Sequence, residues 1–138
     1  MIYEHKSVLL HETVDMINIK KGGIYVDATF GGGGHSRYIL SKEDDINLYV
    51  FDQDIYAIDN GRNNFANDNR IHFINTNFVN VKSALQDMGI YEIDGIIADL
   101  GVSSYQLDTA KRGFSYMKDA PLDMRMDTGS SLTARDVV

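Results

Sequence analysis

The chain has 138 residues, of which 43% are hydrophobic and 24% are charged, and this near-average globular composition excludes a disordered chain. Its length fits one domain of ordinary size. The net charge of −7 argues against a nucleic-acid footprint over the whole surface, because phosphate binding needs Lys and Arg, but it leaves room for a local basic patch.

The first part of the chain predicts a helix, a strand and a second helix. A short helix over Thr13–Ile17 is followed by a turn at 20–23. Ile24–Ala28 is β-branched and aromatic, which is typical of a strand. Four consecutive glycines, Gly31–Gly34, come almost directly after it, and His35–Ser41 is predicted to be the next helix.

The pattern then repeats strand and helix. Asn47–Asp52, Ile71–Ile74 and Ile93–Leu100 are predicted to be the second, third and fourth strands. Asp54 and Asn80 each stand where a side chain caps the helix that follows. This alternation predicts an α/β fold of the Rossmann-like kind, a parallel sheet covered on both faces, with ligands bound beyond the carboxyl ends of the strands.

Beyond the fourth strand the periodicity is lost. Residues 101–131 are rich in Gly, Ser, Asp and Met, and an irregular stretch of that length is more often functional or disordered. Thr133 and Asp136 resemble a capping box, yet the chain stops at Val138, inside the first turn of that helix. We therefore expect that the chain is a fragment of a longer protein.

The glycine run Gly31–Gly34 is the first candidate ligand site. Glycine permits a positive φ in a sharp strand-to-helix turn, and it lets a ligand approach the backbone without a Cβ in the way. The N–H groups at the start of the following helix would favour an anionic ligand group. A plain flexible loop is the alternative, but the strand before the run and the helix after it favour a binding site.

The residues around the glycines narrow the class of ligand. The run contains no lysine, which a P-loop requires, and Ser36 and Arg37 stand where the dinucleotide pattern G-x-G-x-x-G needs a glycine. Asp27 at the strand end is typical of S-adenosylmethionine-dependent methyltransferases. A nicotinamide-dependent oxidoreductase remains the alternative if the glycine turn is considered alone.

Three side chains at the other strand ends complete the candidate site. Asp52 follows the first glycines by about 20 residues, the spacing of a carboxylate that accepts ribose hydroxyls, although an exposed strand-end charge is the alternative. Phe78 follows the third strand and could either pack on an adenine or fill the core. Asp99 ends an apolar strand, where burial without a partner is costly, so we expect it at the open edge of the sheet.

Asp99 is also the candidate catalytic residue. The exocyclic amine of a base has a conjugated and poorly nucleophilic lone pair. A carboxylate that accepts a hydrogen bond from such an amine can orient the lone pair toward a methyl donor.

These residues lie in segments that resemble one family, the bacterial 16S ribosomal RNA (cytosine-N4)-methyltransferases, also called the RsmH/MraW family. The combination of DLGVSS, RGFS and LDMRMD is specific to it. The matching segments run across nearly the whole chain: His5–Glu12, Asp27–Ser36, Phe51–Asp54, Ile93–Ser104, Gln106–Asp108, Arg112–Ser115 and Leu122–Asp127. Tyr105 departs from the family, in which a proline is expected.

The resemblance implies a class I methyltransferase that uses S-adenosylmethionine to methylate a cytosine N4 in the decoding centre of 16S ribosomal RNA, within the small ribosomal subunit. Residues 1–104 would be the N-terminal part of the cofactor-binding domain, and 105–138 the active-site loop and the start of an inserted helical substrate domain. The implied cofactor contacts are Gly33, Gly34, His35, Asp52, Phe78, Asp99 and Gln106.

The remaining expectations concern compartment and partners. The chain has no cysteine, its four histidines show no metal-ligand spacing, and its N-terminus does not resemble a signal peptide, so we expect a cytoplasmic protein without a metal or a membrane partner. The fourth strand would be an unpaired edge at which a homodimer could form. Because the family has longer members, the alternative function is a truncated, non-catalytic fragment that binds the cofactor.

Overall fold

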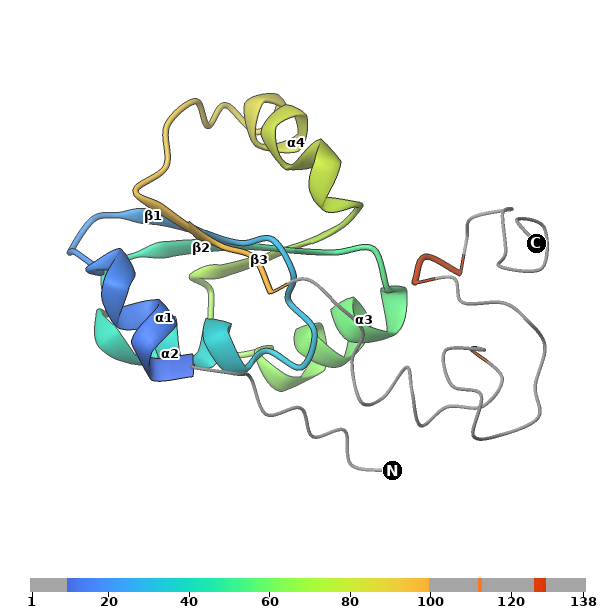
Figure 1. Cartoon of the computed structure of the whole chain (residues 1–138), viewed down its shortest axis with the longest axis horizontal. Coiled ribbons are helices and arrows are strands. Elements are labelled where there is room, and N and C mark those ends of the chain that lie inside the picture. The colour runs from blue at the N-terminus through green and yellow to red at the C-terminus, as the bar shows by residue number, and fades with distance from the viewer. Residues whose placement is uncertain (1–9, 100–111, 113–125, 129–138) are drawn as a thin grey trace.

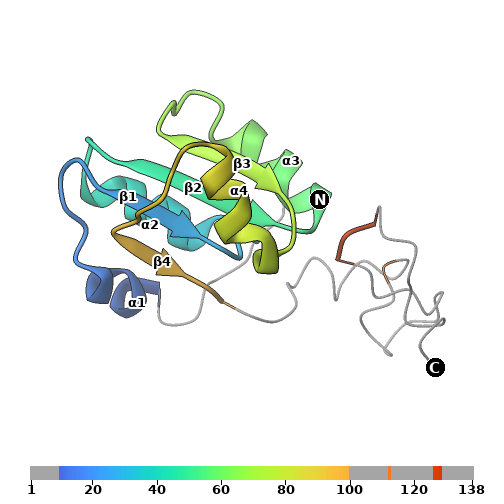
Figure 2. The ribbon, with the colours of Figure 1, turned by 90° about the horizontal axis from the view of Figure 1, so that it is seen from above.

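A four-stranded parallel sheet organises the chain in the computed structural model, which describes residues 10–99, 112 and 126–128. The strand order is β3-β2-β1-β4, and all four strands run in the same direction (Figure 2). The bounds are β1 Ile24–Asp27, β2 Asn47–Asp52, β3 Ile71–Asn75 and β4 Gly95–Ile97. The predicted Rossmann-like α/β arrangement, an incomplete parallel sheet with helices, is confirmed.

Helices cover the two faces unequally. They are α1 Leu10–Ile17, α2 Gly34–Lys42, α3 Ile55–Asn64 and α4 Val81–Asp87, the last preceded by the 3-10 turn η1 Phe78–Asn80. Figure 1 shows α1, α2 and α3 beneath the sheet and α4 above it. The connections through α2 and α3 move outward from β1, whereas the connection through α4 returns to the other side of β1. Right-handed crossovers in opposite directions place their helices on opposite faces.

The side chains of the strands alternate between two hydrophobic clusters, as the period of two residues requires. Tyr25, Leu48 and Val50 pack toward the three-helix face, where Ile39 of α2 is also fully buried. On the other face Val26 and Phe51 of the sheet pack with Val81 and Leu85 of α4. Helices therefore pack on both faces of the sheet near β1 and β2. The glycine turn follows β1, and Asp52 is the last residue of β2.

Three details of the predicted elements are wrong. Helix α1 begins at Leu10 rather than at Thr13. The fourth strand is Gly95–Ile97 rather than Ile93–Leu100, because Asp94 bonds to the first residue of β1 and the paired register starts only at Gly95. Asn80 precedes α4 but makes no side-chain capping bond. Its amide instead donates to Thr76 Oγ1 at 3.1 Å, while Asn77 accepts from Val79 N and caps the 3-10 turn.

Gly61 allows α3 to pack closely under the glycine turn. A Cβ at this buried position would lie 2.6 Å from Cε1 of Phe73 and would also press into the ring of Phe30. The two rings already contact each other edge to face, with centroids 5.3 Å apart. The two rings therefore have little room to move away from an added Cβ.

We predict that Gly61→Ala lowers the free energy of unfolding by about 1–3 kcal/mol through overpacking. Asn63→Ala, at an exposed position of the same helix, should change it by less than about 0.5 kcal/mol. Urea unfolding followed by circular dichroism measures both values. Equal stability of the two variants would show that α3 does not pack this closely on Phe30.

Candidate functional site

The candidate site lies at the carboxyl ends of β1, β2 and β4. Backbone contacts extend the pairing of β1 and β2 beyond the strands, since Phe30 N donates to Phe51 O at 2.9 Å. Gly31 N then donates to Oδ2 of Asp52 at 2.8 Å. The end of β2 thus holds the glycine turn in place.

The glycine turn has the backbone geometry that was predicted. Gly31 and Gly33 have φ angles of 55° and 83°, in the left-handed region that favours glycine. Gly33 is the N-cap of α2, and Gly34 is its first residue. A Cβ at Gly33 would lie 2.9 Å from Cζ of Phe30, so the positive φ and the close approach both require glycine. The turn therefore directs the N-terminus of α2 toward the carboxyl edge of the sheet.

Asp27 connects the end of β1 to the first turn of α2. Its carboxylate is 1% exposed and accepts hydrogen bonds from Ser36 Oγ at 2.7 Å and from Thr29 N at 3.2 Å. Burial raises the pKa of Asp27 to about 6, against the lowering effect of these two donors. Asp27 is thus both a support for the glycine turn and a titratable group at the site.

Asp52 is held at the end of β2 by two backbone donors. In addition to Gly31 N, Asp54 N donates to its Oδ1 at 2.9 Å. Burial raises the pKa of Asp52, while these hydrogen bonds oppose the rise. The alternative of a freely exposed strand-end charge is therefore wrong, because the carboxylate is partly buried and integrated into the turn.

Asp99 lies just beyond β4 and is exposed. Its backbone N–H donates to Oγ1 of Thr29, which joins the exit of β4 to the exit of β1. The charges of Asp52 and Asp99 both raise the pKa of Asp27. The structure therefore brings together three carboxylates that are distant in sequence, at the edge where the sheet order reverses.

The remaining predicted site residues are His35, Phe78 and Gln106. His35 is 5% exposed in the first turn of α2, and Phe78 is 49% exposed in η1, so Phe78 does not fill the core. Gln106 lies outside the described residues. Among the described residues, no group of three or more His, Asp or Glu side chains is arranged to hold a metal ion.

Sequence reasoning missed three residues near this edge: Thr29, Ser36 and Arg112. Thr29 and Ser36 could have been found from their positions two and nine residues after Asp27, within the strand–turn–helix segment. Arg112 lies in the RGFS segment that carries the family resemblance, but nothing near it in the sequence indicates a contact with Asp54. Its guanidinium forms a buried ion pair with Asp54, Nη2 to Oδ2 at 2.9 Å, across 58 positions of sequence.

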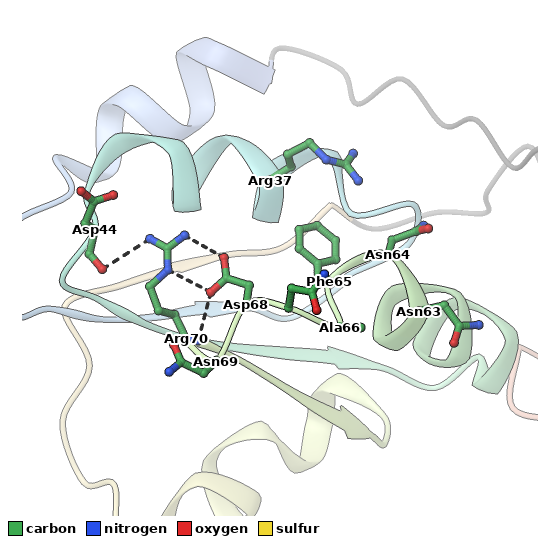
Figure 3. A pocket seen from close by; sticks show the side chains of 10 residues that line it. Arg37, Asp44, Asn63, Asn64, Phe65, Ala66, Asp68, Asn69 and Arg70 are labelled. Atoms are coloured by element: carbon green, nitrogen blue, oxygen red, sulfur yellow. Dashed lines mark hydrogen bonds and ion pairs between the residues drawn. The ribbon is translucent and has the colours of Figure 1, made fainter.

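A hollow of about 580 Å³ lies elsewhere, beside α2 and the segment between α3 and β3 (Figure 3). Its most connected residue is Arg70, which donates to the carbonyls of Leu40 and Glu43 at 3.0 and 2.8 Å and pairs with Asp68 at 2.7 Å. These contacts satisfy carbonyl groups at the end of α2. The hollow is open, contains none of the predicted site residues, and is therefore a structural feature of the amino end of the sheet.

The parallel sheet, its helices and the glycine turn define an incomplete Rossmann-like α/β domain. Residues 2–138 match the sequence model of the MraW methylase family, and the chain belongs to this family. It is 58% identical to a protein of Streptococcus mutans and 56% identical to one of Streptococcus pyogenes, both named "Ribosomal RNA small subunit methyltransferase H". The matches cover 99% of this chain but 44% of each relative, so the chain spans less than half of their length.

Solved structures support the fold. A Streptococcus mutans protein described as a methyltransferase and crystallised with SAH superposes with a TM-score of 0.55 and 20% identity, over 74% of this chain and 55% of that one. The cyclopropane synthase MmaA2 of Mycobacterium tuberculosis gives a TM-score of 0.50 and 12% identity, over 74% and 34% of the two chains. No helix in the described ranges is long and apolar enough to cross a membrane.

The pKa of Asp27 gives a prediction about stability. Because its pKa of about 6 exceeds the ordinary 3.8, the stability that this group contributes is complete below pH 3.8 and is lost as the pH rises through 6. The loss corresponds to about 3 kcal/mol. Asp27→Asn should remove this component, so the free energy of unfolding of the variant should fall less than that of the original chain between pH 4 and pH 8.

Urea unfolding at several pH values measures the difference between the two chains, in which the other titrating groups cancel. Asp59→Asn, which removes an exposed carboxylate of α3, is the control and should leave the pH dependence almost unchanged. Parallel curves for Asp27→Asn and the original chain would show that Asp27 ionises normally.

Proposed function

We propose that the chain supplies the S-adenosylmethionine-binding part of an enzyme that methylates a cytosine N4 in the 16S RNA of the small ribosomal subunit. The observation that carries this proposal is the glycine turn, which is bonded to Asp52 on one side and supported by Asp27 on the other. Family membership, the names of the relatives and the neighbour crystallised with SAH support it.

The charges at the carboxyl edge suit this cofactor. S-adenosylmethionine carries a sulfonium and an ammonium cation, which would be favoured by Asp27, Asp52 and Asp99. Its carboxylate would be favoured by the N-terminus of α2. A nucleoside di- or triphosphate would instead bring several negative charges to an edge that already holds three carboxylates.

We assign the cofactor contacts by position. Gly33, Gly34 and His35 at the start of α2 would bind the methionine part. Asp52 would accept the ribose hydroxyls through the lone pairs that its two backbone donors leave available. Phe78 is exposed at the end of β3 and could offer its ring to the adenine. Gln106, predicted as a further contact, remains part of this proposal.

Asp99 is the proposed catalytic residue. When bound, the cofactor supplies an activated methyl group. The exposed carboxylate of Asp99 would accept a hydrogen bond from the N4 amine of the cytosine and orient its lone pair. Attachment of the Asp99 backbone to Thr29 keeps this carboxylate at the exit of β4, beside the glycine turn.

The wider assignments follow from the same proposal. Residues 1–104 would form the N-terminal part of the cofactor domain, and 105–138 the active-site loop and the beginning of the substrate domain. The site of action would be the cytoplasm, where small ribosomal subunits are assembled. Pairing of a second copy along β4 stays a prediction that sedimentation would test.

The first experiment combines binding and turnover. Isothermal titration with S-adenosylhomocysteine and S-adenosylmethionine should show binding of both. Transfer of labelled methyl groups to unmethylated small-subunit particles would measure activity. Binding without transfer would assign the chain the role of a cofactor-binding fragment, whereas binding of NADH and no response to either methionine derivative would overturn the proposal in favour of an oxidoreductase.

Asp52→Asn should weaken S-adenosylhomocysteine binding by about 10-fold or more, because a charged acceptor of the ribose hydroxyls is lost (about 1.5–3 kcal/mol for a hydrogen bond to a charged group). Asp59→Asn is the matched control on the surface of α3 and should bind normally. Equal affinities of the two variants would show that Asp52 does not contact the ligand.

A further inference from the structure

Arg112 is the most deeply buried cation among the described residues. Its side chain is 4% exposed and that of Asp54 is 3% exposed. The pair is bidentate, with Nη1 to Oδ1 at 3.3 Å and Nη2 to Oδ2 at 2.9 Å. Nη2 also donates to Met126 O at 3.1 Å, and the guanidinium lies 5.2 Å from the centroid of the Tyr56 ring.

Local folding does not require this pair. Asp54 already caps α3 by accepting a hydrogen bond from Tyr56 N at 3.0 Å, which any short polar side chain can do. Burying two charges is expensive, so a buried ion pair is weak evidence for a gain in stability. A role in positioning explains why an arginine distant in sequence is recruited to this cap.

The contacts of Asp54 lead directly to the ligand side of the turn. Asp54 N donates to Oδ1 of Asp52, and Gly31 N donates to Oδ2 of the same carboxylate. A continuous path therefore runs from Arg112 through Asp54 and Asp52 to the glycine turn. The next residue, Gln53, is also held, because its amide donates to Met126 Sδ at 2.9 Å and accepts from Asn77 at 3.0 Å.

Charge acts along the same path. Asp54 raises the pKa of Asp52 by repulsion, and Arg112 lowers it. Loss of Arg112 would leave Asp54 as an uncompensated buried carboxylate beside Asp52. Either the turn would shift, or the unscreened charge of Asp54 would favour protonation of Asp52, and both changes would remove an acceptor from the site.

We propose that Arg112 is a positioning residue of the cofactor site, which acts through Asp54 to hold the carboxylate of Asp52 in place for the ribose of an adenosine-containing ligand. This inference rests on the role proposed above for Asp52. It adds a residue that touches neither the ligand nor the reacting atoms.

A double-mutant cycle tests the path. Arg112→Gln, Asp52→Asn and the double variant are titrated with S-adenosylhomocysteine in the full chain at pH 7. Arg112→Gln should weaken binding by about 10-fold when Asp52 is present and by less than about 2-fold when Asp52 is already Asn, a coupling within the range measured for connected residues. Arg112→Lys, which keeps the charge but loses the fork, should fall between Arg112→Gln and the original chain.

The pH dependence provides a readout that a purely structural role would not move. Without Arg112 the pKa of Asp52 should be higher, so the affinity of Arg112→Gln should fall more steeply than that of the original chain as the pH decreases from 8 to 5. Arg70→Gln is the stability control. It removes contacts to the end of α2, away from the site, and should lower the melting temperature without changing the affinity.

The outcomes separate the two proposals. If Asp52→Asn binds as tightly as the original chain, the proposed function of Asp52 fails. If Asp52→Asn binds weakly but the effect of Arg112→Gln is the same in both backgrounds, or absent, the positioning role of Arg112 is wrong. If Arg112→Gln does not fold, Arg112→Lys and Asp54→Asn each replace it in the cycle with Asp52→Asn. Additive effects of these variants on the affinity would likewise overturn the positioning role of Arg112.

Discussion

The hydrogen bond from Gly31 N to Asp52 Oδ2 is the contact on which the candidate site depends. It joins the turn after β1 to the end of β2, one step beyond the bond from Phe30 N to Phe51 O that continues the parallel pairing. Because both bonds follow from the register of the two strands, the position of the glycine turn is set by the sheet itself. With Gly33 as its N-cap, α2 then begins at Gly34, directly after the turn.

This arrangement concentrates negative charge where the sheet order reverses. Asp27, Asp52 and Asp99 come from three different strands, and burial and mutual repulsion raise the pKa of Asp27 to about 6. Such a cluster is unfavourable without a ligand, and a bound cation would relieve it. The family to which the chain belongs is consistent with a cationic sulfonium ligand, and Arg112 compensates the neighbouring Asp54 from behind the turn.

The amino end of the sheet carries structural contacts, whereas the carboxyl end carries the candidate site. At the amino end, Arg70 bonds to carbonyls at the end of α2 and pairs with Asp68, and the neighbouring hollow contains no candidate site residue. At the carboxyl end, Asp27 and Asp52 accept hydrogen bonds from backbone N–H groups of the turn. The positive φ angles of Gly31 and Gly33 occur at this second end, where ligands bind in sheets of this kind.

The sequence by itself was sufficient for the elements, the parallel sheet, the glycine turn and the cap at Asp54, because each depends on local periodicity, turn chemistry or spacing. It was also sufficient for the family, through segments such as DLGVSS. Only the tertiary structure decided that β4 begins at Gly95, that Asn80 bonds to Thr76, and that Asp54 pairs with Arg112. The contact of Asp94 with Ile24 and that of Arg112 with Asp54 join residues 70 and 58 positions apart, so no local pattern encodes them. Asn80 and Thr76 are only four positions apart, but the local pattern allows either a helix cap or this side-chain bond, and the folded backbone decides between them.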